Sequence, residues 1–292
     1  MLRSRIAPTP SGFIHIGNAY NFVLTWLLTR KENGHLLLRI DDLDAPRIRE
    51  EYIEDIFHSL EWLGIDWDEG PESIEDLYNI YSQRFRVEYY DHLLNEFISK
   101  EKVFACTCSR KDVHLTNEIK QYSGTCRDKN LPLDAPDLSL RLLTPENTFI
   151  EVKNTNGTTS EIDLHALIRD PVLRRKDGIP AYHIASLCDD IRNEISLIVR
   201  GEDLLPSTAL HLYMANIIGN TSFRYCKFHH HELLKDENGN KLSKSEGSIS
   251  LKSMREKSAS PEEFYQWMSE KMELPVCNSA QELLVEFTRI NP

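Results

Sequence analysis

The chain has 292 residues and a formal net charge of −12, with 40% hydrophobic and 27% charged residues. This composition is typical of a globular protein, and it excludes low-complexity and membrane-spanning classes because no run approaches the roughly 20 apolar residues of a membrane span. The acidic balance argues against a general nucleic-acid coat, although a local basic patch suffices for an enzyme acting on RNA. The best candidate patch, which also reads as an ordinary solvated loop, is Arg169, Arg174, Arg175 and Lys176.

The first elements alternate strand, helix and strand. A short buried strand is expected over residues 3–7, before a loop rich in proline, serine and glycine. Apolar residues then recur at helical spacing over 18–32, and Asn33-Gly34 ends that helix. The apolar run 35–40 is typical of a strand inside a parallel sheet. This order predicts a right-handed β-α-β unit and an α/β fold with a doubly wound parallel sheet.

Further elements follow with less regular spacing. Helices are expected over 48–63, 74–99 and 204–218, and a core strand over 195–200. Near the end of the chain, Ser260-Pro261 and Ser279 each mark a helix start, the second with a capping box that includes Glu282. The N-terminus lacks an apolar signal core, so we expect a cytoplasmic protein.

Three of the six cysteines, Cys106, Cys108 and Cys126, lie close together in the chain. Such a cluster indicates a metal site, because a large chain does not need a disulfide framework, although free thiols in a reducing compartment are the simpler alternative. Zn²⁺ takes four ligands, and a closed thiolate set indicates a structural site. The candidates for the fourth ligand are Tyr122, His114 and Asp128, and coordination chemistry alone favours His114.

Two distant segments carry the chemistry. The first is Pro8-Thr9-Pro10-Ser11-Gly12-Phe13-Ile14-His15-Ile16-Gly17-Asn18, and the second is Lys241-Leu242-Ser243-Lys244-Ser245. Glycines allow the backbone to approach a nucleotide, and His15 can donate to a phosphate oxygen. Lys241 and Lys244 can neutralise the β- and γ-phosphates as pyrophosphate leaves. Each segment alone is a weak signal, but the pair indicates chemistry on ATP.

The two segments resemble the HIGH and KMSKS motifs of class I aminoacyl-tRNA synthetases. Residues 5–12 and 39–44 narrow the resemblance to the glutamyl and glutaminyl group, as do 182–186 with Asp189-Asp190, and 199–205. The likeness covers roughly residues 3 to 250. It implies activation of L-glutamate by ATP with Mg²⁺, and then transfer of the glutamyl group to a tRNA hydroxyl.

The resemblance also implies residue roles. Catalysis and ATP binding would fall to His15, Gly17, Asn18, Lys241 and Lys244, with Ser243 also at the ATP. Arg5 and Arg200 would hold the side-chain carboxylate of glutamate, since arginine presents forked donors. Tyr182 would line the same pocket, Asp41 would meet the α-ammonium group, and the remaining pocket residues would be Ile6, Ala7, Pro8 and Thr9.

Each of these roles has a simpler alternative, and two positions depart from the family pattern. Arg5 could cap a strand, Tyr182 could be a core residue, and Asp41 could be one of three acids that solvate a loop. Asn18 stands where the motif has its last histidine, and Asp41 stands where bacterial glutamyl enzymes usually carry Glu. The shorter side chain of Asp41 would then reach the ammonium group through water.

The pattern Cys106-x-Cys108…Tyr122-x3-Cys126 resembles that of the small glutamyl-queuosine tRNA(Asp) synthetases, which implies Tyr122 as the fourth zinc ligand. The short segment after the KLSKS sequence points to the same group, whose acceptor is queuosine in the anticodon of tRNA(Asp). The alternatives are a shortened glutamyl or glutaminyl synthetase that charges the tRNA 3′ end, and a non-catalytic paralogue. We expect a monomer without membrane association.

On this resemblance we divide the chain into four parts. Residues 1–103 would form the first half of a Rossmann-like catalytic domain, and 104–134 the zinc-binding part of an insertion. Residues 135–248 would form the second half with the KLSKS loop, and 249–292 a short helical C-terminal segment.

Overall fold

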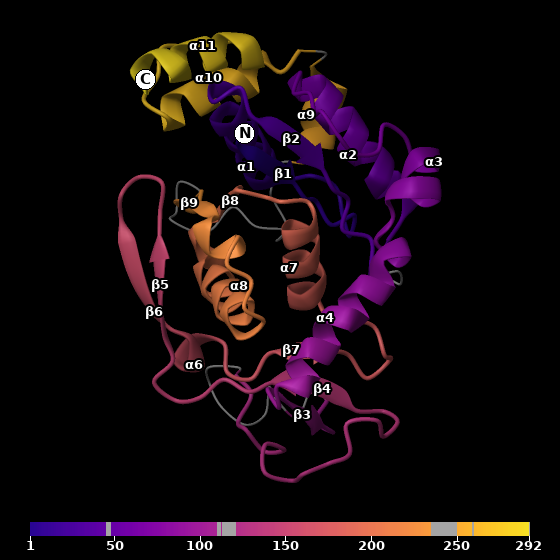
Figure 1. Cartoon of the computed structure of the whole chain (residues 1–292). Coiled ribbons are helices and arrows are strands. Elements are labelled where there is room, and N and C mark those ends of the chain that lie inside the picture. The colour runs from indigo at the N-terminus through magenta and orange to yellow at the C-terminus, as the bar shows by residue number, and fades with distance from the viewer. Residues whose placement is uncertain (45–47, 110–111, 113–120, 235–249, 259, 292) are drawn as a thin grey trace. The chain divides into compact units, whose positions relative to one another are not determined.

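The computed structural model describes residues 1–44, 48–109, 112, 121–234, 250–258 and 260–291 (Figure 1). They form two compact units: unit 1 is Met1–Phe85, Ser196–Glu202 and His231–Pro292, and unit 2 is Arg86–Ile195 and Asp203–His230. Each unit contains helices and strands, which confirms the mixed α/β class. Among the described residues, no helix is both long and apolar enough to cross a membrane. The four-part division by sequence stays a prediction.

Unit 1 begins with the predicted β-α-β unit. Strand β1 (Arg3–Ile6) pairs in parallel with β2 (His35–Leu38), and helix α1 (Ile16–Lys31) connects them. Strand β8 (Leu197–Gly201) runs beside β1, because the Ser196 amide donates to the Arg3 carbonyl at 2.8 Å and the Ser4 hydroxyl donates to the Leu197 carbonyl at 2.9 Å. Three strands therefore bring their carboxyl ends to one region of unit 1.

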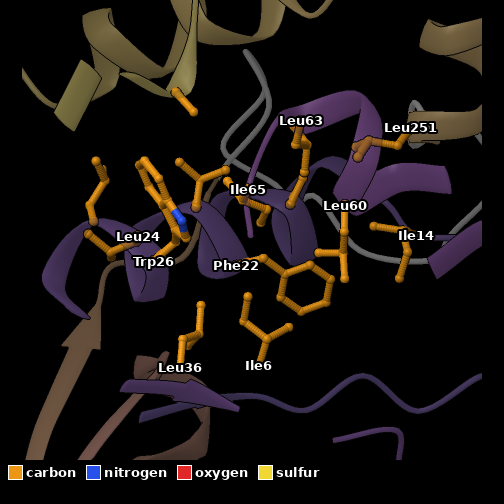
Figure 2. Packing of buried hydrophobic residues seen from close by; sticks show 14 of the residues in the cluster. Ile6, Ile14, Phe22, Leu24, Trp26, Leu36, Leu60, Leu63, Ile65 and Leu251 are labelled. Atoms are coloured by element: carbon orange, nitrogen blue, oxygen red, sulfur yellow. The ribbon is translucent and has the colours of Figure 1, made fainter. Parts of the chain in front are cut away.

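The core of unit 1 lies between these strands and the helices that cover them. Figure 2 shows Phe22 of α1 among Ile6 of β1, Leu36 of β2 and Leu60 of α2 (Glu50–Leu63), all of which are buried. The remaining helices of the unit are α9 (Leu251–Lys257), α10 (Glu262–Lys271) and α11 (Ala280–Ile290). Helix α11 begins at the predicted cap, where the Ser279 hydroxyl accepts from the Glu282 amide at 3.3 Å. The Glu282 carboxylate accepts from the Asn278 amide instead of completing the reciprocal box at Ser279.

The predicted helix over 74–99 is wrong as a single element. The chain forms helix α3 (Ile74–Asp76), a π-helical turn η2 (Leu77–Tyr81), a 3-10 turn η3 (Gln83–Arg86) and helix α4 (Val87–Ser99). The break falls at Ser82, whose hydroxyl donates to the Asp42 carboxylate at 2.6 Å. The Gln83 amide donates to the same carboxylate at 2.7 Å. These tertiary hydrogen bonds override helical propensity, because Asp42 takes backbone and side-chain donors that a helix would use locally.

Unit 2 contains antiparallel sheets, which the predicted doubly wound parallel sheet did not include. Strand β4 (Ser139–Leu142) pairs with β3 (Val103–Cys106) and with β7 (Val172–Arg174), and β5 (Phe149–Lys153) forms a hairpin with β6 (Thr159–Asp163). The further elements from this part of the chain are α6 (Leu164–Leu167), α7 (Tyr182–Arg192), η4 (Glu202–Leu204), α8 (Leu205–Ile217), η5 (Phe223–Tyr225) and β9 (Lys227–His231).

One glycine is required where a loop lies against β2. The Asp68 amide donates to the Leu36 carbonyl, and the Leu38 amide donates to the Glu69 carbonyl, both at 2.8 Å. Gly70 follows with φ of +125°, and a Cβ atom there would lie 2.1 Å from the Leu38 carbonyl oxygen. No L side chain fits this position without moving the strand.

Candidate active site and metal cluster

His15 forms the N-cap of α1 and explains why that helix begins two residues before its predicted start. Its Nδ1 accepts from the amides of Gly17 at 3.1 Å and Asn18 at 3.3 Å. Because Nδ1 is an acceptor, the ring proton of neutral His15 is on Nε2. The imidazole is therefore locked in the tautomer that can donate to a phosphate oxygen, while Gly17 and Asn18 serve first as partners of that ring.

The second ATP motif is not placed. Lys241, Ser243 and Lys244 lie outside the described residues, as does His114. The described chain resumes at Ser250, which forms an antiparallel bridge with His15, and the Leu251 amide donates to the Ile14 carbonyl at 2.8 Å. Ser250 and Leu251, which follow the KLSKS sequence in the chain, therefore lie beside the first motif.

The predicted glutamate-binding residues of unit 1 come from neighbouring strands. Arg5 lies within β1 and Arg200 within β8, and their exposed fractions are 6% and 4%. The interpretation of Arg5 as a simple strand cap is therefore wrong. Residues 6–9 continue past β1 alongside residues 39–41, because the Arg39 amide donates to the Ile6 carbonyl and the Asp41 amide to the Pro8 carbonyl, each at 2.9 Å.

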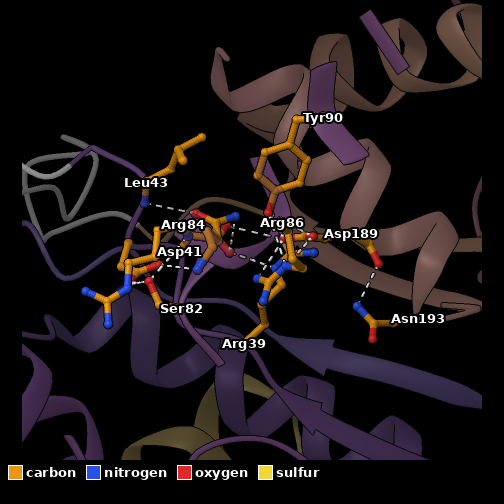
Figure 3. A network of polar contacts seen from close by, with 11 residues as sticks. Arg39, Asp41, Leu43, Ser82, Arg84, Arg86, Tyr90, Asp189 and Asn193 are labelled. Carbon is orange, nitrogen blue, oxygen red and sulfur yellow. Dashed lines mark hydrogen bonds and ion pairs between the residues drawn. The ribbon is translucent and has the colours of Figure 1, made fainter. Parts of the chain in front are cut away.

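Asp41 is 7% exposed, which contradicts the alternative that it solvates a loop. Its carboxylate forms a two-point ion pair with Arg39, with Nε to Oδ1 at 2.7 Å and Nη2 to Oδ2 at 3.2 Å (Figure 3). The Gln83 side-chain amide also donates to Oδ1 at 3.4 Å. Sequence reasoning missed Arg39 as a partner, although its spacing of two from Asp41 places both side chains on the same side of an extended segment.

Tyr182 belongs to unit 2, where it is the first residue of α7 and 44% exposed. This exposure contradicts the alternative that Tyr182 is a core residue. Helix α7 is held from its other end, since Asp189 accepts from Arg86 Nε at 2.8 Å and from the Tyr90 hydroxyl at 3.0 Å (Figure 3). Asp189 is fully buried, so this pair from α4 and the preceding turn holds α7 and leaves its first residue accessible.

The three predicted cysteine ligands converge in unit 2. The sulfur atoms of Cys106, Cys108 and Cys126 all lie within 4.8 Å of one another, and no histidine or carboxylate among the described residues joins them. The Tyr122 hydroxyl lies 3.6 Å from the Cys106 sulfur and accepts from the Cys126 amide at 2.7 Å. Asp128 is exposed. Three thiols and one phenol oxygen are a donor set that fits Zn²⁺.

The electrostatics of this cluster also fit a cation. Burial acts to raise the pKa of the Cys126 thiol, but hydrogen bonds from Thr107 outweigh it and bring this pKa to about 6. Burial and the hydrogen bond with Cys126 raise the pKa of Cys108 to about 12. The Cys126 thiolate forms readily and opposes ionisation of Cys108, so a nearby positive charge would favour the second thiolate.

Buried Asp170 lies beside the cluster and contacts two arginines, Arg127 in the turn after Cys126 and Arg141 in β4. The Asp170 carboxylate forms an ion pair with Arg127 at 2.6 Å, and the Asp170 carbonyl accepts from Arg141 Nη1 at 2.8 Å. Arg141 lies over the face of the Tyr122 ring. Sequence analysis missed both arginines, because neither lies within a recognisable motif.

The basic patch predicted for RNA is largely committed to internal contacts. Lys176 donates to the Thr107 carbonyl at 2.5 Å, Arg174 donates to the Leu133 carbonyl at 3.1 Å, and Arg175 pairs with Asp177 at 2.6 Å. These side chains hold loops around the cysteine cluster, so the patch stays only a prediction for RNA binding.

Comparison with solved structures identifies the fold. Glutamate-tRNA synthetase from Elizabethkingia anophelis aligns with a TM-score of 0.77 at 24% identity, over 98% of this chain and 66% of that one. Mycobacterium tuberculosis methionyl-tRNA synthetase aligns with a TM-score of 0.55 at 12% identity, over 88% of this chain and 61% of that one. The fold is that of a class I tRNA synthetase catalytic domain.

A family model described as tRNA synthetases class I (E and Q), catalytic domain, matches residues 1–271. The chain therefore belongs to the glutamyl and glutaminyl (E and Q) family of class I tRNA synthetases.

Similar curated proteins carry two kinds of name. The Glutamyl-Q tRNA(Asp) synthetases of Nitratidesulfovibrio vulgaris and Prochlorococcus marinus are each 35% identical; the matches cover 87% and 93% of this chain, and 81% and 82% of those proteins. A glutamate–tRNA ligase from a Thermoanaerobacter species is 32% identical over 92% of this chain and 57% of its own length. The chain thus spans most of the first kind and little more than half of the second.

Proposed function

We propose that the protein activates L-glutamate with ATP and transfers the glutamyl group to queuosine in the anticodon of tRNA(Asp). The observation that carries the proposal is the grouping in unit 1 of His15, buried Arg5 and Arg200, and the Arg39–Asp41 pair around adjoining strand ends. Ligands of open α/β sheets bind outside the carboxyl ends of the strands. The family membership supports the same reaction class.

The chemistry follows from these groups. Arg5 and Arg200 would bind the side-chain carboxylate of glutamate, and Asp41 would face the α-ammonium group, with its carboxylate oriented by the ion pair with Arg39. An oxygen of the α-carboxylate attacks the α-phosphorus of ATP, and the bond to pyrophosphate breaks with its electron pair leaving on pyrophosphate. His15 Nε2–H would donate to a phosphate oxygen as charge develops, and Lys241 and Lys244 would neutralise the leaving group. Mg²⁺ bound to ATP supplies further charge neutralisation.

In the second step a hydroxyl of queuosine attacks the glutamyl carbonyl, loses its proton, and displaces AMP. Tyr182 would line the glutamate pocket, as the family resemblance implies. Zn²⁺ held by Cys106, Cys108, Tyr122 and Cys126 would stabilise the insertion of unit 2, because a closed set of four ligands leaves no open position for substrate. We propose a structural role for this metal.

The second candidate function is charging of the tRNA 3′ end, which the likeness to glutamate–tRNA ligases favours. The convergence of Tyr122 with the three cysteines favours the queuosine reaction, because this ligand pattern is the one that resembles the queuosine-specific group.

The deciding experiment is transfer of labelled glutamate, with ATP and Mg²⁺, to tRNA from cells that contain or lack queuosine. Nuclease digestion then locates the label on the anticodon nucleotide or on the terminal adenosine. Label confined to queuosine-containing anticodons supports the proposal. Equal label on the 3′ ends of both pools would establish the second candidate. The Lys244→Ala variant is the control, and we expect it to retain its fold while glutamate-dependent pyrophosphate exchange falls by orders of magnitude.

A further inference from the structure

Asp55 lies in the middle of α2 and contacts two segments that are far apart in the chain. Its Oδ2 accepts from the backbone amide of Ile14 at 2.9 Å. Its Oδ1 forms a short ion pair with the guanidinium of Arg255 in α9. Asp55 is 3% exposed, so both contacts are made out of water. A single buried carboxylate therefore joins the residue before His15 to the helix that follows residues 235–249.

The surrounding contacts link the same two segments. The Leu251 amide donates to the Ile14 carbonyl at 2.8 Å, and His15 forms a bridge with Ser250. The Lys252 ammonium lies 4.3 Å from the centre of the Phe13 ring. That ring in turn packs edge-to-face against Tyr52 of α2, with the two ring centres 5.0 Å apart. The first motif and the start of α9 are thus anchored on one face of α2.

The choice of an acid at this position needs an explanation. A buried carboxylate is costly unless it is paired, and apolar side chains of similar size often pack at least as stably. Burial raises the pKa of the Asp55 carboxyl, while the Ile14 amide, Arg255 and Lys252 favour its ionised form. What the carboxylate supplies, and an apolar residue could not, is a directional link between two particular groups.

Such a link matters for the proposed chemistry, on which the following inference rests. His15 and the lysines of the KLSKS sequence must act on the same triphosphate, and misplacement of a preorganised group by about 1 Å can cost about 100-fold in rate. We propose that Asp55 is a positioning residue. Through Ile14 and Arg255 it holds the histidine of the first motif and helix α9, the first described helix after the KLSKS sequence, in one fixed arrangement.

The test compares two matched aspartates. Asp55→Asn keeps an oxygen for the Ile14 amide and removes the charge that pairs with Arg255. Asp68→Asn is the control, because Asp68 likewise accepts from a backbone amide (Leu36, 2.7 Å) and pairs with an arginine (Arg30, 2.7 Å), but contacts neither motif. In glutamate-dependent pyrophosphate exchange, we expect Asp55→Asn to lower kcat about 10- to 100-fold with the KM for glutamate within about twofold. Asp68→Asn should keep the wild-type kcat.

A second measurement does not need activity. Amide hydrogen exchange over 250–257 should accelerate at least about tenfold in Asp55→Asn and remain unchanged in Asp68→Asn, because the first change releases α9 from α2. If the wild-type protein does not activate glutamate, the proposed function fails while this exchange result still tests the link. Should Asp55→Asn not fold, Arg255→Lys is measured in the same two assays. Wild-type kcat and exchange in these variants, or losses no larger than those of Asp68→Asn, would overturn the inference.

Discussion

The guanidinium carbon of Arg141 lies 3.9 Å from the centre of the Tyr122 ring. Arg141 belongs to strand β4, and its guanidinium donates to the Asp170 carbonyl. The Tyr122 ring is therefore held on one face by a residue of this strand. The phenol oxygen then lies 3.6 Å from the Cys106 sulfur. This relationship gives the proposed fourth ligand a defined orientation.

Replacement of Arg141 by leucine should therefore weaken zinc binding about tenfold, because residues that orient metal ligands commonly contribute 10- to 100-fold to affinity. Competition with a chromophoric chelator measures the affinity. Cys108→Ser should lose the metal and serves as the lower reference. Arg192→Leu is the control, because Arg192 also lies 3.9 Å from the centre of a tyrosine ring, that of Tyr89, which is not among the proposed ligands. Wild-type affinity in Arg141→Leu would show that Tyr122 needs no support, and a metal-free wild-type protein would end the zinc proposal.

Arg200→Leu should raise the KM for glutamate at least about 100-fold while the KM for ATP changes by less than about threefold. The reason is that a buried arginine near the end of β8 is placed to bind a carboxylate and not the nucleotide. Steady-state pyrophosphate exchange with each substrate varied in turn gives both constants. Equal losses for glutamate and ATP would indicate a general structural role instead.

Gly70→Ala should destabilise the protein by about 2–4 kcal/mol. Its φ of +125° is unfavourable for alanine, and the added methyl group would meet the Leu38 carbonyl at 2.1 Å. Denaturant unfolding measures the change. Gly64→Ala is a suitable comparison because Gly64 also has a positive φ, of +70°, but has nothing within 4 Å of its Cβ position. If the two variants were equally stable, the contact with Leu38 would not contribute to the loss of stability.

Stability in acid should depend on Arg30. Burial acts to raise the pKa of Asp66 and Asp68, but hydrogen bonds to Arg30, with Trp26 for Asp66 and the Leu36 amide for Asp68, hold both pKa values below the usual one. The folded state therefore binds fewer protons than the unfolded state, and this stabilisation is present above the unfolded pKa of about 4 and lost as pH falls through the lower folded values.

Arg30→Gln should accordingly be less stable than wild type by about 1 kcal/mol at pH 7, since the aspartates are partly exposed and solvent weakens the pairs. The difference should shrink below about pH 4. Urea unfolding at a series of pH values tests this expectation, and a difference that is independent of pH would assign the loss to packing of the arginine side chain.

The elements that could be predicted are those whose signal is local. The β-α-β opening follows from apolar runs and helical spacing, and the cap at Ser279 involves neighbours within a few residues. Helix α1 does end just before Asn33-Gly34, but the left-handed residue there is Asn33, with φ of +48°, and not the expected glycine. The cysteine spacing likewise predicted a cluster, and the three sulfur atoms do converge. In these cases the residues that interact are close in the chain, or they are all members of one recognisable motif.

The sequence by itself thus determined the α/β class, the first motif and the candidate ligands, because periodicity, capping and ligand chemistry are properties of the residues themselves. Only the tertiary structure decided the break at Ser82, the pairing of Arg39 with Asp41, and the link from Asp55 to Ile14 and Arg255. Asp55 and Arg255 are 200 positions apart, and no local pattern records which of many charged residues will meet. Burial makes that choice, since a carboxylate removed from water is stable only where the fold supplies donors.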